Sequence, residues 1–372
     1  MKATVLDSYL SVPKADWDAL VGDGSPFLEW AFLAGLEELD CAVEATGWVP
    51  RPILVTTDAG AVVGGAPGWV KTHSMGEFVY DHGWADAAHR AGIPYFPKLI
   101  IGVPFTPVTG ARLLVHPDAD PEAVRSALLR GIEEASSGCH GVHVLFDTQG
   151  EADWLDAHGA FPRLQFQFHW HNQGYEDFEG WLKTFPSKKR NKIRRERRDL
   201  AGIEIIATRS PSPELLDGMH AFYRNTCRQF GPWGRIYLSQ ELFQHLGRVW
   251  GDRLHLVTAT RDGTMVAGAF NVIKGERLYG RYWGATDDVK FLHFEVCYYR
   301  AIEECIRLGL KVFEPGHGGG HKYRRGFRPT LTRSSHFLHH RGLHDALAGY
   351  SEDEAEHVRE RLAALKARTP TA

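Results

Sequence analysis

The sequence has no long apolar run and no paired cysteines. Nothing in its 372 residues approaches the ~18 consecutive apolar residues of a membrane helix, and residues 1–9 lack the basic and apolar regions of a secretory signal. The five cysteines are odd in number and scattered, with no C-x-x-C pair to suggest zinc or a redox motif. We therefore expect a cytoplasmic protein with reduced thiols and no membrane span.

The charge of the chain is nearly balanced except in one short segment. The net charge at pH 7 is -3, so the chain as a whole does not attract polyanions. In residues 187–198, however, eight of twelve positions are Lys or Arg. This basic segment is either a solvated helix face or a contact for the phosphates of a donor, made through Lys188, Lys189, Arg194 and Arg195.

Length and composition indicate a globular chain of two domains. With 43% hydrophobic and 12% aromatic residues the chain can bury a large core, and at ~150 residues per domain its length suggests two. Helical and strand patterns alternate, which predicts an α/β (α+β) fold with one mixed sheet in each half and helices on its faces. Helices are expected at 15–21, 27–39, 121–136, 213–228, 240–250, 293–308 and 352–366.

An internal repeat supports two similar halves. Residues 54–66 and 257–269 both read as a strand, a glycine turn and a second strand, which is typical of an antiparallel hairpin. Gly60 and Gly263 are 203 positions apart, and Ala66 meets Ala269 at the same offset. A second echo pairs the tryptophan of Tyr80–Trp84 with that of Gly280–Gly284, at an offset of 199.

Six short strings of the sequence are similar to those of one family. They are FLEW (27–30), PKL (97–99), VPFTPVTG (103–110), HWHN (169–172), GRYWG (280–284) and LHFE (292–295). On these strings the chain resembles the FemAB-like predicted N-acyltransferases, a peptidoglycan biosynthesis or recognition type within the GNAT superfamily. The resemblance covers most of the chain.

The resemblance implies two tandem GNAT-like domains, 1–165 and 166–345, followed by a C-terminal helix or tail at 346–372. It also implies transfer of an aminoacyl group from aminoacyl-tRNA to an amine of a small molecule or peptide, by direct attack without a covalent enzyme intermediate. An acyl-CoA-dependent N-acyltransferase and a non-catalytic peptide or cell-wall recognition module stay open as alternatives. A nucleic-acid-binding regulator would need a helix-turn-helix or a broadly basic face, and the sequence has neither.

The acyl donor is suggested by a missing loop. Ordinary GNAT domains bind pyrophosphate with a Q/R-x-x-G-x-G/A segment before a helix, and neither half of this chain contains it. Its absence favours aminoacyl-tRNA over acetyl-CoA, although other acyl-CoA donors do not require that loop. We expect no permanently bound cofactor, and no motif indicates the oligomeric state.

Acyl transfer to an amine needs a group that removes a proton, because the amine attacks only when uncharged. His293 and Glu295 are the first candidates, since they lie at the start of the helix 293–308, where free N–H groups and the helix dipole gather. Two residues apart on a helix, they are expected to point in different directions. Arg281 and Tyr282, from the string 280–284, complete the predicted catalytic set, with Trp283 beside them as a substrate contact.

The glycine-rich segment 314–327 is the second candidate constellation. Backbone N–H groups of such a loop can approach an anion, and Lys322 and Arg325 add charge for the donor phosphates. The resemblance implies that relatives more often carry a glutamate at the position of Gly320, so this protein either lacks the step that such a glutamate serves or uses Glu314 or His321 instead in the substrate site. His317 and His321 are four residues apart, but no third ligand is indicated and we expect no metal.

Polar and aromatic residues of the first half complete the predicted substrate site. Its loop at 104–110 resembles the substrate-side loop of FemABX enzymes, and we expect the site to lie between the halves. The substrate-binding candidates of this half are Asp81, Trp84, Asp86, Lys98, Phe105, Thr106 and Thr109.

Overall fold

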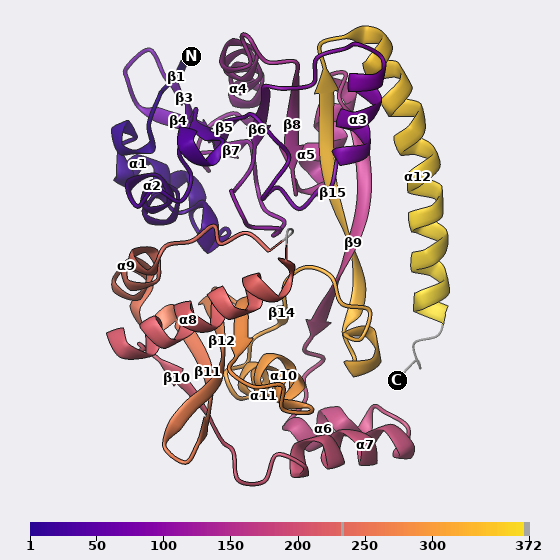
Figure 1. Ribbon diagram of the computed structural model, residues 1–372. Helices are drawn as coiled ribbons and strands as arrows, with labels where there is room; N and C mark the ends of the chain where they lie inside the picture. The colour runs from indigo at the N-terminus through magenta and orange to yellow at the C-terminus, as the bar shows by residue number, and fades with distance from the viewer. Residues whose placement is uncertain (232–233, 368–372) are drawn as a thin grey trace. The chain divides into compact units, whose positions relative to one another are not determined.

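The computed structural model describes residues 1–231 and 234–367 (Figure 1). Mainly antiparallel sheets flanked by helices confirm the predicted α/β fold class. The chain forms two compact units: the first is Met1–Phe166 with Leu331–Leu362, and the second is Gln167–Thr330 with Ala363–Ala372. Residues 331–362, which we expected in the second domain and the tail, thus group with the first unit.

The first unit contains two sheets. One has the order β1-β3-β4-β7 and the other β15-β8-β6-β5-β2, in which β6 and β8 run parallel. The strands are β1 (Lys2–Val5), β2 (Trp48–Pro50), β3 (Ile53–Thr56), β4 (Val62–Ala66), β5 (Gly68–Lys71), β6 (Lys98–Ile101), β7 (Leu114–Val115), β8 (Gly141–Leu145) and β15 (Arg328–Leu338). The helices are α1 (Lys14–Val21), α2 (Trp30–Glu38), α3 (His82–Arg90), α4 (Pro121–Ala135), α5 (Gln149–Ala157) and α12 (Arg341–Ala367).

The second unit is built on strands in the order β10-β11-β12-β13-β14-β9, of which β9 begins with residues of the first unit. These are β9 (Phe161–His171), β10 (Glu204–Arg209), β11 (Leu254–Arg261), β12 (Thr264–Lys274), β13 (Arg277–Ala285) and β14 (Val312–Glu314). Its helices are α6 (Phe178–Lys183), α7 (Ser187–Arg198), α8 (Pro213–Gln229), α9 (Gln240–Trp250), α10 (Leu292–Phe294) and α11 (Arg300–Arg307), with a π-helical turn at Glu295–Tyr299.

The two predicted hairpins exist, but at the repeat offset their registers differ by one residue, because Ala66 and Ala269 are 203 positions apart and their partners are 204 apart. Ile53 pairs with Ala66 in β3 and β4, and Val257 pairs with Ala269 in β11 and β12. Each hairpin also has a β-bulge, and the residue it leaves unpaired lies at the repeat offset, Val63 in the first hairpin and Val266 in the second. Because a bulge at one position is a specific feature of a strand pair, this agreement supports a true repeat.

A glycine at the same place in both hairpins lets a helix approach the sheet. A Cβ atom on Gly65 would lie 2.9 Å from the Trp17 ring of α1, and one on Gly268 would lie 2.3 Å from the Met219 sulfur of α8. These two glycines are 203 positions apart, the offset of the repeat. The repeated sequence therefore encodes the packing of a helix on the hairpin as well as the hairpin itself.

The expectation of one sheet per half is wrong for the first unit. Pro67 separates β4 from β5, which belong to different sheets, because proline has no N–H to continue the ladder. At the same offset in the second unit Phe270 stands in a continuous β12, and the ladder with β13 shifts there by a bulge. The second echo was also wrong, since Trp84 lies on α3 and Trp283 on β13.

The helix predictions agree closely with the structure, with identifiable exceptions. The helix predicted at 240–250 is α9, whereas α12 begins at Arg341, eleven positions before the predicted start. Helices α3 and α5 were not predicted, and the end of the tail lies outside the described residues. Among the described residues no helix is long and apolar enough to cross a membrane.

Replacing Gly65 with valine should destabilise the first unit by about 1–3 kcal/mol, because the new side chain collides with the buried Trp17 ring. The free energy of unfolding in urea measures this cost. Gly83→Ala is the matched control, since a Cβ there meets nothing within 4 Å. Equal stability of the two variants would contradict the packing role of Gly65.

Candidate active site

The segment that leads from β13 into α10 has an unusual backbone. Phe291 has a φ of 72°, in the left-handed region that bulky residues rarely adopt. Directly after α10, the helix widens into the π-helical turn Glu295–Tyr299 before α11 continues it. Strained residues and π-helical turns concentrate at functional sites. The backbone thus singles out the helix start that contains both predicted bases.

His293 lies in an aromatic cluster of the second unit. Its ring centroid is 4.5 Å from that of Trp283, 5.1 Å from that of Tyr298 and 5.7 Å from that of His321. Burial, with the nearby charges of Lys322 and Arg325, lowers the pKa of His293 to about 3. The histidine is therefore neutral at physiological pH, and it does not titrate near the ordinary value of ~6.5.

Tyr298 and His321 form a hydrogen-bonded pair beside His293. The phenol oxygen of Tyr298 is 2.9 Å from Nε2 of His321, which lies on the glycine-rich segment after β14. Burial raises the pKa of the Tyr298 phenol, so the hydroxyl keeps its proton. Burial also lowers the pKa of His321. Two neutral histidines and a phenol thus meet at one point.

Glu295 has different neighbours from His293, as their spacing predicts. Its Oε1 accepts hydrogen bonds from Nε and Nη2 of Arg197, at 3.1 and 2.8 Å. Its Oε2 is buried and has no hydrogen-bond partner among the described residues. Burial raises the pKa of Glu295, and Arg197 offsets part of that rise. Arg197 therefore fixes one oxygen of the carboxylate, and the other is a buried oxygen that is open only in the sense that it has no hydrogen-bond partner among the described residues.

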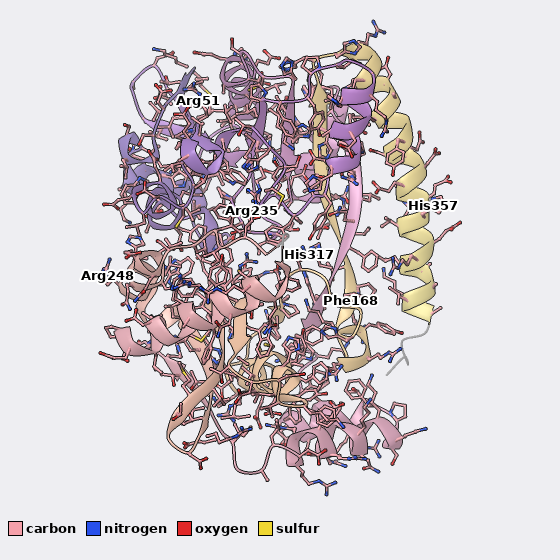
Figure 2. The ribbon with its side chains drawn as sticks, viewed as in Figure 1. Arg51, Phe168, Arg235, Arg248, His317 and His357 are labelled. Atoms are coloured by element: carbon pink, nitrogen blue, oxygen red, sulfur yellow. The ribbon has the colours of Figure 1, made fainter. Side chains whose placement is uncertain are left out.

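Lys322 is enclosed by the glycine-rich segment, which also carries His317, labelled in Figure 2. Its ammonium donates to the carbonyl oxygens of Gly316 and His317, at 2.6 and 3.2 Å. Only these two carbonyls accept from it among the described residues, which leaves one of three N–H groups available. Burial lowers the pKa of Lys322 to about 8. A Cβ on Gly319 would lie 2.9 Å from the His321 ring, so the tight turn requires glycine there.

The remaining predicted residues of the second unit divide between site and core. Trp283 contacts His293, and Arg281 is the extra residue of the bulge between β12 and β13. The Tyr282 ring, by contrast, packs among Tyr223, Phe243 and Phe270.

Two charged residues of the glycine-rich segment are buried, and each contacts another side chain. Glu314 accepts a hydrogen bond from Arg277 at 2.8 Å, and burial raises its pKa. Arg325 stacks on the Phe294 ring at 3.2 Å and therefore lies against the helix that carries His293. The roles predicted for the residues of β13, for Glu314 and for Arg325 stay predictions.

The basic segment is helix α7, and its cations differ in environment. Lys188 and Arg195 are exposed, whereas Lys189 packs over the Phe185 ring at 4.5 Å and Arg194 pairs with Glu179 at 2.5 Å. Arg195 is 3.7 Å from Asp199, an exposed ion pair that contributes little to stability. Lys188 and Arg195 are therefore the predicted donor contacts that a phosphate could reach most directly.

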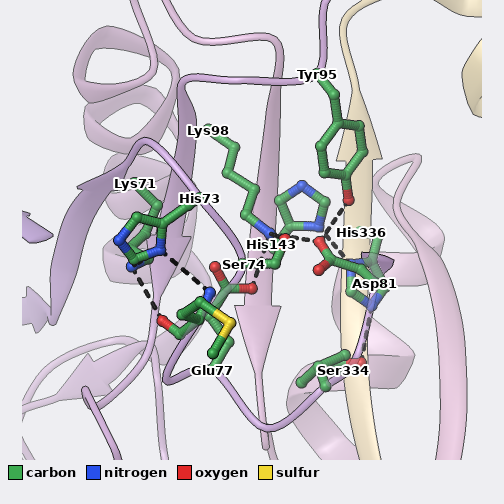
Figure 3. A network of polar contacts seen from close by, with 12 residues as sticks. Lys71, His73, Ser74, Glu77, Asp81, Tyr95, Lys98, His143, Ser334 and His336 are labelled. Atoms are coloured by element: carbon green, nitrogen blue, oxygen red, sulfur yellow. Dashed lines mark hydrogen bonds and ion pairs between the residues drawn. The ribbon is translucent and has the colours of Figure 1, made fainter. Parts of the chain in front are cut away.

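The polar residues of the first unit form a buried network (Figure 3). The Lys98 ammonium donates to Asp81, to Glu77 at 2.8 Å and to Ser74 at 3.3 Å, and Tyr95 donates to Asp81 at 2.6 Å. Burial would raise the pKa of Asp81, but Lys98 outweighs it and holds the pKa well below its ordinary value. Burial raises the pKa of Glu77 to about 7 despite Lys98.

Two histidines extend this network, and the sequence analysis missed both. Nδ1 of His143 is 2.7 Å from Nδ1 of His336, whose Nε2 is 2.8 Å from the Ser334 hydroxyl (Figure 3). Burial lowers the pKa of both rings, that of His143 to about 3. His143 has a signal in the sequence, as the lone polar residue of the apolar run Gly141–Leu145, whereas His336 follows two serines and has none.

The other candidates of the first unit have separate surroundings. Trp84 packs on His336 at 4.8 Å between ring centroids, while Asp86 is exposed on α3. Phe105 is buried against Trp48 and has a φ of 57°, and the Thr106 hydroxyl donates to the Pro104 carbonyl. Thr109 is half-buried. Whether these residues bind substrate stays a prediction.

Replacing Lys98 with methionine should destabilise the protein by about 3–5 kcal/mol, because Asp81 and Glu77 would keep buried charge without a cation. Thermal and urea unfolding measure the loss. Lys14→Ala, which removes an exposed ion pair with Asp18, is the matched control and should cost less than about 1 kcal/mol. A Lys98 variant as stable as this control would show that the network contributes little.

The family model for FemAB-like proteins, described as peptidoglycan biosynthesis/recognition, matches residues 8–372. The crystal structure of FemX has a TM-score of 0.55 at 12% identity, covering 94% of this chain and 100% of FemX. L-PGS from Bacillus licheniformis has a TM-score of 0.45 at 11% identity, covering 82% and 90% of the two chains. A tandem GNAT protein from the clavulanic acid biosynthesis pathway has a TM-score of 0.44 at 10% identity, covering 90% and 98%.

Curated protein sequences give no significant match, and the FemX likeness at this identity establishes the fold alone. Among the described residues, no group of three or more His, Cys, Asp or Glu side chains could hold a metal ion. The family model, however, spans nearly the whole sequence. The chain belongs to the FemAB-like family.

Proposed function

We propose that this protein is an N-acyltransferase that moves an aminoacyl group from aminoacyl-tRNA to an amine of a small molecule or peptide. Membership of a family described as peptidoglycan biosynthesis/recognition and the fold likeness to FemX are consistent with this activity. The observation that carries the proposal is a helix start at which the neutral His293 lies near the charge of Lys322, followed by a π-helical turn that carries the buried Glu295. A carboxylate, a neutral imidazole and a buried ammonium are the groups that aminolysis of an ester requires.

The reaction needs a proton acceptor, an oriented amine and a donor to the developing oxyanion. The amine nitrogen attacks the acyl carbon, and the C–N bond forms while the carbonyl oxygen gains negative charge. The proton released by the nitrogen passes to the base. The ester C–O bond then breaks, and the leaving hydroxyl oxygen takes up a proton. No bond to the enzyme forms at any stage.

Glu295 suits the role of base better than His293. A general base works best when its pKa lies near the working pH, and burial moves the pKa of Glu295 upward, toward neutrality. The pKa of His293, at about 3, makes it a weak base but a steady hydrogen-bonding group. We assign proton removal to the open Oε2 of Glu295 and orientation of the acceptor to the ring of His293.

Lys322 is suited to stabilise the oxyanion. Two carbonyls hold its ammonium in place, and its remaining N–H is available for a developing negative charge. The Tyr298 hydroxyl, hydrogen-bonded to His321, is a proton donor for the leaving oxygen. Preorganised donors of this kind act most strongly where burial excludes water.

The donor assignment rests on α7 and on the missing pyrophosphate loop. Exposed Lys188 and Arg195 give salt-dependent contacts to phosphates without sequence preference. Mass analysis of the purified protein, incubated with amines and either charged tRNA or acyl-CoA, tests the activity directly. Acylated amine formed with charged tRNA supports the proposal. Acylated amine formed only with acyl-CoA would show that acyl-CoA is the donor, and no acylated amine with either donor would overturn the proposal.

The rate should depend on pH in a bell-shaped manner. It should rise as Glu295 loses its proton, above the ordinary value of 4.5, and fall as Lys322 loses its proton, at about pH 8. Lys322→Arg should move the alkaline fall upward, because a guanidinium stays charged, and Lys322→Met should lower kcat by about 10²–10³. The profile of kcat against pH measures both.

Lys311→Arg, at an exposed residue paired with Glu276, is the matched control and should leave that profile unchanged. An alkaline fall that stays at the same pH in Lys322→Arg would remove Lys322 from the chemistry.

Replacing Lys188 and Arg195 with alanine should weaken binding of tRNA and lower the slope of log Kd against log salt by roughly one to two, because phosphate contacts release counterions. Titrations at several salt concentrations measure the slope. Lys311→Ala serves as the control for removal of a surface charge in the same unit. An unchanged affinity and slope would make the outer face of α7 a solvated surface.

A further inference from the structure

Helix α7 has two different faces. Lys188, Lys192, Arg195 and Arg198 are exposed, whereas Glu196 is buried and Arg197 is half-buried. Among twelve residues with eight cations, Glu196 is the one acid, and it points inward. A solvated or phosphate-binding helix does not need a buried acid such as Glu196 beside a half-buried cation such as Arg197. The inner face of α7 therefore has a role of its own.

Glu196 contacts two residues that border the candidate site. Its Oε2 accepts a hydrogen bond from the Tyr299 hydroxyl at 2.5 Å and lies 3.4 Å from Nη2 of Arg325. Tyr299 is the last residue of the π-helical turn, and Arg325 stacks on Phe294 beside His293. Glu196 thus ties the end of the turn to the segment that carries Lys322.

Arg197 holds the middle of the same region. Its guanidinium donates twice to Oε1 of Glu295 and once, at 3.1 Å, to Glu303 on α11. It also lies over the Phe178 ring at 4.6 Å, which fixes its plane. Charge-assisted hydrogen bonds of this kind are stronger and more directional than neutral ones. The orientation of the open Oε2 of Glu295 follows from the grip on Oε1.

A π-helical turn has i→i+5 hydrogen bonds in place of those of an α-helix, and such turns are frequent at functional sites. We propose that Glu196 and Arg197 are positioning residues that hold the Glu295–Tyr299 turn in its reactive geometry. The role in catalysis rests on the proposed function, whereas the role in holding the turn does not. The proposed donor contacts on the outer face of α7 and the hydrogen bonds from Arg197 to Glu295 then come from the same helix.

Hydrogen exchange of the amides of residues 295–299 tests the holding role without any activity assay. Arg197→Ala and Glu196→Gln should raise exchange there at least several-fold, while Lys311→Ala, which removes an exposed ion pair of the same unit, should leave it unchanged. Arg197→Lys keeps the charge without the fork and serves if the alanine variant does not fold. Exchange in folded variants equal to that of the control would overturn the proposal.

Kinetics then test positioning against a merely structural effect. Arg197→Lys should lower kcat about tenfold or more with little change in KM for the donor, because Glu295 loses its fixed oxygen while the outer cations remain. Exposed-face variants should show the reverse pattern, with a higher KM for the donor. A raised KM with full kcat in Arg197→Lys would overturn positioning. If the variants exchange faster but the unmodified protein transfers no acyl group, the holding role stands. The proposed function is then wrong.

Discussion

The ion pair between Arg197 and Glu295 is the contact on which the rest of the candidate site depends. A carboxylate buried to this degree is costly unless a cation compensates it, and Arg197 does so through two donors to one oxygen. That compensation lets an acid stand at the π-helical turn with its second oxygen open. Because Arg197 comes from α7, a side chain of the basic helix contacts the π-helical turn that follows α10. The composition of α7 alone predicts a solvated helix, but this contact holds it next to the candidate site.

The repeat shows what a sequence can encode locally. The repeat encodes the two hairpins, their bulges at Val63 and Val266, and the glycines at 65 and 268. All of these follow from residue types whose effects act over a few neighbours. The same reasoning found the helix start at His293. It failed at Pro67, which separates β4 from β5 in the first unit. In the second unit the equivalent strand β12 continues and has only a bulge there, although the pattern of apolar residues is similar in both units.

The candidate site could be located in the sequence but not understood from it. His293, Glu295 and Lys322 were named from their place at a helix start and in a glycine-rich segment. Their order of importance needed the fold, because Glu295 gains an open oxygen through Arg197, 98 positions away. The same holds for the pair His143 and His336, 193 positions apart. The pairing of residues so far apart in the chain leaves no local signal, so the sequence alone named His293 and Glu295 together as the first candidates.

Two buried lysines show how partners decide what a buried cation can do. Burial alone lowers the pKa of a lysine, but Asp81 and Glu77 raise the pKa of Lys98 above its ordinary value. Lys322 is enclosed by carbonyls instead, and burial lowers its pKa to about 8. Lys98 is therefore a fixed charge whose hydrogen bonds are taken up by its own network. Lys322 keeps a donor available and changes charge near physiological pH, and of the two it is the lysine that can respond to a negative charge on a substrate.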